Sequence, residues 1–259
     1  ADKRVDKKDA YELYRKAGYQ ILRDRGDLTK MSSGKVLGIF SDSHLPYSVD
    51  WKHDQMLARK TPKLSELVGA AIQNLRGSKN GFLLQIEAGR VDHACHANDV
   101  SGMFYDQIEG EEAVRVALEF AREDQETLVI ITADHACGGP NLNGAGYEYK
   151  DATEGLLTLT NMRSSVSNVV SEIKALGKDD KEKITVGSVR DLIEEHLALK
   201  ITQAEGEYIV QAAKGGMDKA VPEFKRGLTE CVGDVVGNYT KVTYTSTNHT
   251  NDHVLVSAF

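Results

Sequence analysis

The chain has 259 residues, and at roughly 150 residues per domain this length suits one large domain or a domain that carries an insertion. Hydrophobic residues make up 41% and charged residues 27% of the sequence, and no apolar run approaches the roughly 18 residues that a membrane span requires. Disordered and membrane-spanning classes are therefore excluded. Acidic residues outnumber basic ones, 39 against 32, which gives a net charge of −7. A chain of this charge is not expected to bind nucleic acid over a broad basic face.

The first helical pattern extends from Asp9 to Arg25, where apolar side chains recur along one stripe. Asp9 and Glu12 have the spacing of a capping box at its start. A short apolar run over residues 35–40 predicts a buried strand that leads into a turn-rich loop. A second helix is expected over residues 61–75.

Two further apolar runs, residues 81–86 and 127–132, flank a long helical pattern over residues 93–123. Alternation of apolar strands with helices is typical of a parallel sheet that is covered on both faces. The sequence therefore predicts an α/β fold with a mainly parallel sheet and helices on both faces. In such sheets, ligands bind beyond the carboxyl ends of the strands.

Helical periodicity dominates residues 161–237, and Ser188 and Thr202 both have the character of helix starts. Strand patterns return at residues 241–245 and 254–259. We therefore predict one α/β domain fragment over residues 1–259, with a helical insertion over residues 161–237 within it. Because the chain starts without Met and stops inside an apolar run, we expect it to be part of a longer protein.

The three cysteines, Cys95, Cys137 and Cys231, are odd in number and widely spaced. They form neither a disulfide framework nor the paired spacing of a zinc knuckle. Each is expected to be a buried or partly buried thiol.

Polar clusters adjoin the predicted strands. One strand pattern ends at Glu87, and Asp92 and His96 follow at the start of a helix. Residues four apart lie on one face of a helix, so this carboxylate and this imidazole can share one metal ion. Such a pair standing alone is usually a solvated helix face.

The second cluster is Asp134 and His135, which follow the strand over residues 127–132 and precede a Gly-rich turn. Neighbouring side chains diverge in a regular strand, so these two can converge only where the strand stops. The third cluster is a polar turn with His249 near its centre. Together the clusters offer nitrogen and oxygen donors suited to zinc, with an oxygen site nearby for magnesium. Two zinc ions about 3.5–4 Å apart are a common device for displacement at phosphorus.

In this order the three clusters resemble the metal-site motifs of the alkaline phosphatases. The resemblance covers roughly residues 35–140 and 240–259. It implies two Zn2+ and one Mg2+ as cofactors. It assigns the first zinc ion, which activates the water that hydrolyses the phosphoenzyme, to Asp92, His96 and His249.

The same resemblance assigns the second zinc ion, which activates a serine nucleophile, to Asp134 and His135. It assigns magnesium to Glu87 and a phosphate contact to His93. The family's Asp-Ser-Ala nucleophile motif is missing here, and the Asp-Ser pair within residues 42–44 is better explained as a turn. We therefore expect the carboxyl-terminal part of an alkaline phosphatase, without a catalytic nucleophile and inactive alone.

The resemblance further implies small phosphomonoester substrates, a homodimer for the full-length enzyme and a periplasmic or secreted location. The charge and composition already predict no nucleic acid partner and no membrane span. Two alternatives stay open. One is a phosphodiesterase, sulfatase or mutase of the same superfamily, although a carboxylate at Glu87, five residues before Asp92, fits phosphatases better. The other is a catalytically inactive metal-binding module.

Overall fold

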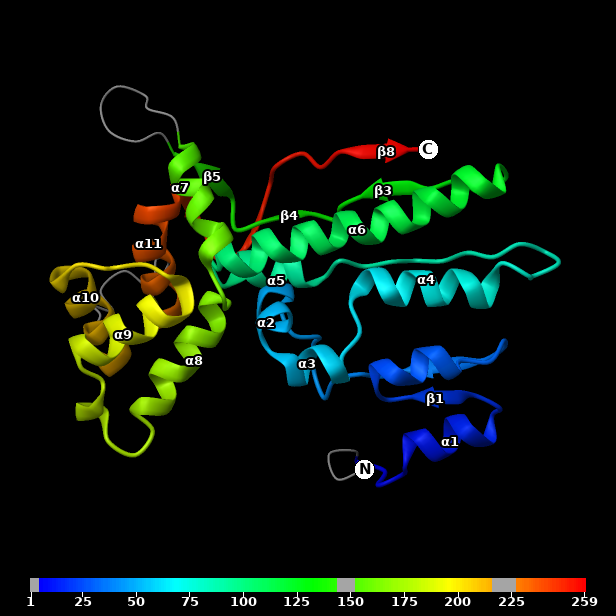
Figure 1. The fold of residues 1–259 in the computed structure, drawn as a ribbon, viewed down its shortest axis with the longest axis horizontal. Coiled ribbons are helices and arrows are strands. Elements are labelled where there is room, and N and C mark those ends of the chain that lie inside the picture. The colour runs from blue at the N-terminus through cyan, green and yellow to red at the C-terminus, as the bar shows by residue number, and fades with distance from the viewer. Residues whose placement is uncertain (1–4, 144–151, 216–226) are drawn as a thin grey trace.

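The computed structural model describes residues 5–143, 152–215 and 227–259. The 25-residue helix α6 (Val100–Asp124) extends through the middle of the molecule. At one of its ends lies a group of helices from the C-terminal half, and the first helices and strands lie on another side (Figure 1). The chain thus mixes helices with short strands, as an α/β fold requires.

The elements follow one another in three stretches. The first contains α1 (Ala10–Lys16), β1 (Gln20–Leu22), the 3-10 helix η1 (Arg25–Lys30), β2 (Val36–Gly38), α2 (Ser48–His53), α3 (Gln55–Lys60) and α4 (Leu64–Leu75). The second contains α5 (Arg90–His96), α6, β3 (Ile130–Thr132), β4 (Ala136–Cys137) and β5 (Pro140–Leu142). The third contains α7 (Thr153–Thr158), η2 (Leu159–Asn161), α8 (Val166–Leu176), η3 (Lys181–Lys183), α9 (Val186–Leu197), α10 (Gln203–Lys214), α11 (Leu228–Thr240), β6 (Val242–Tyr244), β7 (His249–Thr250) and β8 (Val256–Ala258).

Two predicted helices differ from the observed ones. The helix expected over residues 9–25 ends at Lys16, because Gly18 adopts a left-handed backbone with φ of 83° and the chain turns back as β1. The helix expected over residues 93–123 is divided into α5 and α6 by a corner at residues 97–99. Asn98 has a φ of 50° at that corner, a conformation that ends a helix. The helix start at Thr202 is confirmed, since its side chain caps α10. The start predicted at Ser188 is wrong, because Thr185 caps α9 and Ser188 lies in the first turn of that helix.

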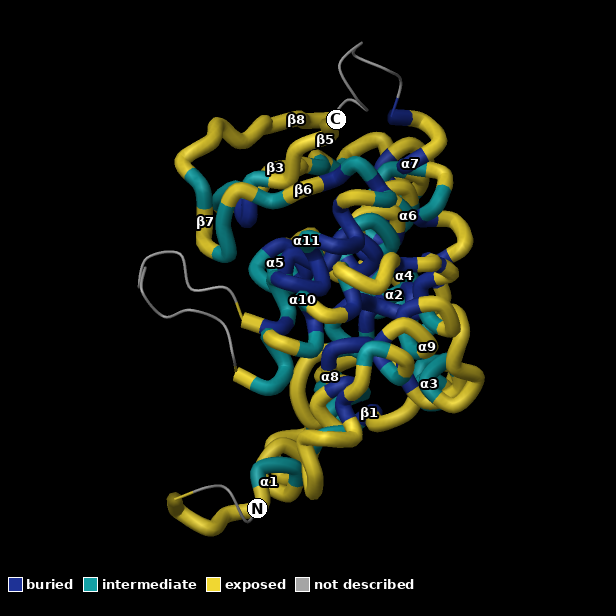
Figure 2. The backbone as a smooth tube through the Cα atoms, turned by 90° about the vertical axis from the view of Figure 1, so that its left-hand side faces the viewer, coloured by how far each residue is buried: buried dark blue, intermediate teal, exposed yellow. Residues whose placement is uncertain are grey.

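The strands form two-stranded pairs in the described residues. β1 pairs with β2 in parallel, whereas β3–β8, β4–β7 and β5–β6 pair antiparallel. The predicted mainly parallel pairing is therefore not found among the described strands, because the C-terminal segment returns antiparallel to residues 130–142. These last three pairs are nested, so residues 130–142 and 242–258 run alongside each other as one interrupted ribbon. Residues 81–86, predicted as a strand, have no ladder partner in the described part, and Leu83 is 94% exposed. Figure 2 shows β3 and β8 exposed, α5 half-buried and α11 largely buried.

The largest core lies among α8, α9, α10 and α11. Val169, Ile193, Ile209 and Val232 are fully buried there. Val100 of α6 and Val242 of β6 belong to the same cluster, so the helical group packs directly against the elements that lead to the site. Burial of one such side chain contributes about 1.5–3 kcal/mol.

A buried carboxylate joins two of these helices. Asp99 is fully buried and accepts hydrogen bonds from the backbone N–H groups of Gly102 at 2.8 Å, Val166 at 3.0 Å and Ser167 at 2.9 Å. It therefore caps α6 and also satisfies the first amides of α8. Burial raises the pKa of Asp99, and the amide donors act against that rise.

Replacement of Asp99 by Ala should destabilise the fold strongly. The change leaves two buried N–H groups and one half-buried N–H group without an acceptor, at about 1–3 kcal/mol for each buried group, so we expect a loss of at least about 2 kcal/mol in the free energy of unfolding. Urea denaturation followed by circular dichroism measures it. Asp54→Ala is the matched control because Asp54 caps the exposed start of α3, where losing a cap costs about 1 kcal/mol. Equal losses in the two variants would contradict this role for Asp99.

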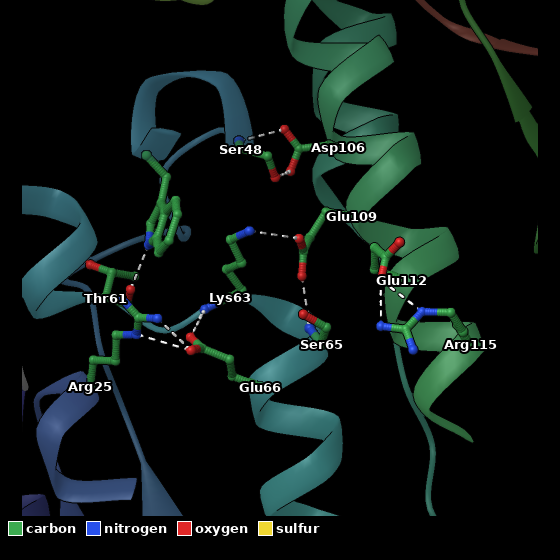
Figure 3. A network of polar contacts seen from close by, with 11 residues as sticks. Arg25, Ser48, Thr61, Lys63, Ser65, Glu66, Asp106, Glu109, Glu112 and Arg115 are labelled. Carbon is green, nitrogen blue, oxygen red and sulfur yellow. Dashed lines mark hydrogen bonds and ion pairs between the residues drawn. The ribbon is translucent and has the colours of Figure 1, made fainter. Parts of the chain in front are cut away.

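A second polar network joins α2 and α4 to α6 (Figure 3). Asp106 accepts hydrogen bonds from the Ser48 backbone N–H at 2.9 Å and from the Ser48 hydroxyl at 3.1 Å. Glu109 accepts one from the Ser65 N–H at 2.9 Å and lies 3.8 Å from the Lys63 ammonium. Burial raises the pKa of Asp106 from 3.8 to about 6.

The raised pKa of Asp106 makes stability depend on pH in a defined direction. A carboxyl whose pKa is higher in the folded state stabilises the fold fully below pH 3.8, and this contribution is lost as the pH rises through about 6. Asp106→Asn imitates the protonated form and can keep both contacts with Ser48. The wild type should therefore lose about 2–3 kcal/mol relative to the variant between about pH 4 and pH 7. Chemical denaturation of both proteins across this window measures the difference, and a constant difference would contradict the expectation.

Candidate metal centre

The short helix α5 presents the first part of the centre. Asp92 lies in its first turn and His96 is its last residue. One helical turn separates the two side chains, and Asp92 Oδ1 lies 3.4 Å from His96 Nε2. The sequence expectation that these two residues share a helix face is therefore met by the geometry.

The β4–β7 pair presents the second part. Its register places Cys137 opposite His249, with His135 just before β4. The rings of His135 and His249 stack with centroids 3.5 Å apart and planes at 22°. His249 Nε2 lies 3.7 Å from Asp92 Oδ1, and His135 Nδ1 lies 4.0 Å from it. One carboxylate oxygen thus faces nitrogen atoms of three histidines.

The tautomer of His96 is set by a hydrogen bond to the backbone. Its Nδ1 lies 2.6 Å from the carbonyl oxygen of Thr247. A carbonyl oxygen can only accept, so Nδ1 carries the proton and Nε2 keeps its lone pair toward Asp92. This is the orientation that a metal-binding imidazole requires, and a backbone carbonyl is a common partner for its other nitrogen.

The turn before β7 is held against α5 by further backbone contacts. The Asn98 side-chain amide donates to the carbonyl oxygens of Cys95 at 3.1 Å and Ser246 at 2.8 Å. Gly139 has a left-handed φ of 54°, and a Cβ at this position would lie 2.2 Å from Thr245 Oγ1. The approach of the two chain segments therefore requires glycine.

The donor set fits a zinc ion. Asp92 Oδ1 and His135 Nδ1 are buried and have no hydrogen-bond partner in the described structure, an arrangement that native proteins rarely leave without a ligand. Two ligand atoms of a tetrahedral zinc ion lie about 3.3–3.4 Å apart. The separations of 3.4 Å and 3.7 Å from Asp92 Oδ1 to His96 and His249 are close to this value.

Asp134 and His135 form a second pair beside the first group. Asp134 Oδ2 lies 3.2 Å from His135 Nε2, again a separation suited to two ligands of one ion. The other carboxylate oxygen of Asp134 accepts from the His135 backbone N–H at 3.1 Å. The Asp134 side chain is 85% exposed, so this pair is open to solvent on one side.

Glu87 and His93 lie outside this group of donors. Glu87 is exposed at the wall of a cavity of about 340 Å³, whose lining also includes Trp51 and Arg90. No hydrogen bond or ion pair links it to the other predicted ligands within the described residues. His93 Nδ1 lies 3.2 Å from Arg90 Nη1 and therefore accepts from it, and the His93 ring lies 4.1 Å from that of His44. Burial, and then the positive charges of His44 and Arg90, lower the pKa of His93.

Sequence reasoning missed Cys137, which lies among the donor atoms. Its Sγ belongs to a group with Asp92, His96 and His249 in which one ligand atom from each lies within 4.8 Å of the others. Burial, followed by the nearby Asp92, raises the pKa of this thiol to about 12. The available signal in the sequence was its position two residues after His135. Side chains alternate along a strand, so two residues at this spacing would lie on the same face. All three cysteines are buried, as expected, and form no disulfide in the described part of the chain.

The chain belongs to the alkaline phosphatase family, whose sequence profile matches residues 1–259. It is 30% identical over 246 residues to alkaline phosphatase 4 of Bacillus subtilis, a match that covers 95% of this chain and 48% of that protein. It is 28% identical over 256 residues to alkaline phosphatase 3 of the same organism, with 98% and 50% covered. The predicted family is thereby confirmed, and the chain spans about half the length of these relatives.

The fold is similar to solved alkaline phosphatases. The crystal structure of the Thermus thermophilus enzyme matches with a TM-score of 0.86 and 26% identity, covering 99% of this chain and 54% of that one. The cold-active enzyme from Shewanella sp. matches in fold with a TM-score of 0.74 and 21% identity, covering 96% and 55%. The predicted α/β class of the alkaline phosphatase type is therefore confirmed. No helix in the described residues is long and apolar enough to cross a membrane.

Zinc ions should stabilise the metal-free chain through this centre. Binding at a concentration 100-fold above Kd raises the free energy of unfolding by about 2.7 kcal/mol, so we expect a higher Tm. His249→Ala should weaken zinc binding more than the roughly 10–100-fold that follows from losing a ligand's hydrogen-bond partner. Calorimetric titration and thermal denaturation measure the two effects. His53→Ala, which changes an exposed histidine of α2, is the control. A zinc response unchanged by His249→Ala would contradict this assignment.

Proposed function

We propose that this protein hydrolyses small phosphomonoesters as an alkaline phosphatase, with two zinc ions and one magnesium ion. The observation that supports this most strongly is the convergence of His96 and His249 on one buried, unpartnered oxygen of Asp92. Family membership supports the same reaction class. The reaction proceeds through a phosphoserine whose serine lies outside this chain.

In this proposal Asp92, His96 and His249 hold the first zinc ion, and Asp134 and His135 hold the second. Zinc supplies a lowered pKa for bound water and for the serine hydroxyl, as well as positive charge beside the phosphate. The chain's own part is to fix the donor atoms before any ion binds. The Thr247 carbonyl holds the tautomer of His96, and stacking on His135 holds the ring of His249.

Glu87 is proposed as the magnesium ligand and His93 as a phosphate contact. A carboxylate oxygen suits magnesium, which keeps several waters and takes few protein ligands. His93 accepts from Arg90 through Nδ1, so its Nε2 carries the proton. That N–H can donate to a phosphate oxygen, directly or through water.

Two serine positions support a nucleophile from outside the chain. The Ser246 hydroxyl, in the turn before His249, donates to the Asn248 carbonyl at 3.2 Å and accepts from its N–H at 2.8 Å. Both hydrogen bonds of this hydroxyl are therefore made within its own turn. Ser43, the nearest imitation of the family motif, is exposed in the loop after β2. Within the described residues, neither serine forms a hydrogen bond with the proposed metal ligands.

For the whole protein we further propose that it forms a homodimer, lies in the periplasm or is secreted, and has no nucleic acid partner. For the domain fragment we propose a helical insertion over residues 161–237. The packing of α8 to α11 against one another in the largest core cluster supports the insertion.

Inorganic phosphate and p-nitrophenyl phosphate test the proposed function. Phosphate should further raise the Tm of the zinc-loaded chain, and it should do so more than sulfate does, because the proposed site serves phosphomonoesters. This response should disappear in His249→Ala and persist in His53→Ala. With zinc and magnesium present, p-nitrophenyl phosphate should not be hydrolysed at an ordinary enzyme rate, since the nucleophile is absent.

Metal-dependent turnover at an ordinary rate would show that a group within this chain attacks phosphorus, which would overturn the assignment of the nucleophile. Equal responses to phosphate and sulfate would instead favour the sulfatase alternative. A zinc-loaded chain that responds to neither anion would favour an inactive metal-binding module.

A further inference from the structure

His44 lies beside His93, the residue proposed to contact phosphate. It belongs to the loop after β2, and the centroids of the two imidazole rings lie 4.1 Å apart with their planes at 49°. His44 is exposed, and it forms no hydrogen bond or ion pair among residues 5–143, 152–215 and 227–259. Its ring nitrogens are therefore accessible to a ligand that approaches His93 from solvent.

The loop that carries His44 is fixed against α5 and α6. Tyr47 is buried in one apolar cluster with Ala94 of α5. Ser48 donates from its backbone N–H and from its hydroxyl to Asp106 of α6. These anchored residues begin only three positions after His44. The backbone at His44 is therefore held beside α5 by packing and hydrogen bonds, although its side chain faces solvent.

Arg90 places a positive charge next to the two rings. Its Nη1 donates to His93 Nδ1 at 3.2 Å, and its guanidinium carbon lies 3.6 Å from the centroid of the Tyr47 ring. Its Nε is buried and has no hydrogen-bond partner in the described structure, where Arg90 also forms no ion pair. A guanidinium without an ion-pair partner attracts an anion. The charge therefore favours binding of a phosphate beside His93.

We propose that His44 donates a second hydrogen bond to the phosphate that His93 contacts, so that the two imidazoles bind oxygens of one phosphoryl group. The inference rests on the proposed function and deepens it, because it adds a phosphate-binding residue to the same site. An imidazole carries at least one N–H in either protonation state, so the contact does not require a charged ring. Since His44 adds no ligand to either zinc ion, water and the serine hydroxyl keep the metal positions that the proposed function gives them.

Two substitutions of His44 test this contact in the zinc-loaded chain. His44→Phe keeps an aromatic ring against His93 but has no N–H, whereas His44→Gln keeps an N–H donor without the ring. Calorimetric titration with inorganic phosphate should show binding about threefold to tenfold weaker in His44→Phe, with a smaller loss in His44→Gln. Zinc affinity should be unchanged in both variants. His53→Ala, at an exposed histidine of α2, is the control and should bind phosphate like the wild type.

The phenylalanine variant separates a direct contact from a supporting role. A ring that only holds His93 in place would give wild-type phosphate affinity in His44→Phe, and this result would overturn the inference. A loss of zinc affinity in that variant would also overturn it, because His44 would then act on the metal ligands. NMR of the wild type with isotope-labelled histidine gives a test that needs no variant. The His44 imidazole signal should shift when phosphate is added, and an unchanged signal would contradict the contact.

Failure of the proposed function has a different signature. A wild-type chain that binds zinc but no phosphate would overturn the proposed function, and this inference with it. Failure of the His44 inference alone leaves phosphate binding and its dependence on His249 intact.

Discussion

The corner between α5 and α6 is the contact on which the rest of the structure depends. Asp99 accepts from the Gly102 amide in the first turn of α6 and from the first two amides of α8, and it therefore holds the helical group to the long central helix. Asn98, the preceding residue, donates to the Ser246 carbonyl and so holds the turn before β7. Both residues belong to one corner. The packing of the helical group and the placement of His249 beside Asp92 therefore depend on the same short segment of backbone. A change that loosens this corner acts on the core and on the metal centre together.

The metal centre is arranged around a single oxygen. Asp92 Oδ1 is buried, has no hydrogen bond within the part of the chain that the structure describes, and faces the nitrogens of His96, His135 and His249. A buried carboxylate oxygen without a donor is unfavourable. A divalent cation at this place removes that penalty. Metal binding is therefore expected to contribute to folding as well as to chemistry, since the donors converge only in the folded chain.

The sequence indicated the class of the fold and most of the element types, but not their lengths or partners. Apolar runs such as residues 127–132 do predict strands. Whether such a strand pairs parallel or antiparallel, however, depends on which distant segment lies alongside it. Here residues 242–258 return along residues 130–142, a relation that no local pattern contains. Helix ends were missed where one residue takes a left-handed backbone, at Gly18 and Asn98, because the apolar stripe continues past both.

For the site, spacing alone determined that Asp92 and His96 share a helix face, and the order of the motifs indicated the family. These features depend only on helix geometry and on the identity of residues along the chain, so they can be read without coordinates. The tertiary structure decided the rest. The ladder between β4 and β7 brought Cys137 into the donor group, and the Thr247 carbonyl fixed the tautomer of His96. Both are contacts between segments more than a hundred residues apart, and their closeness follows from packing and strand register, which sequence spacing does not encode.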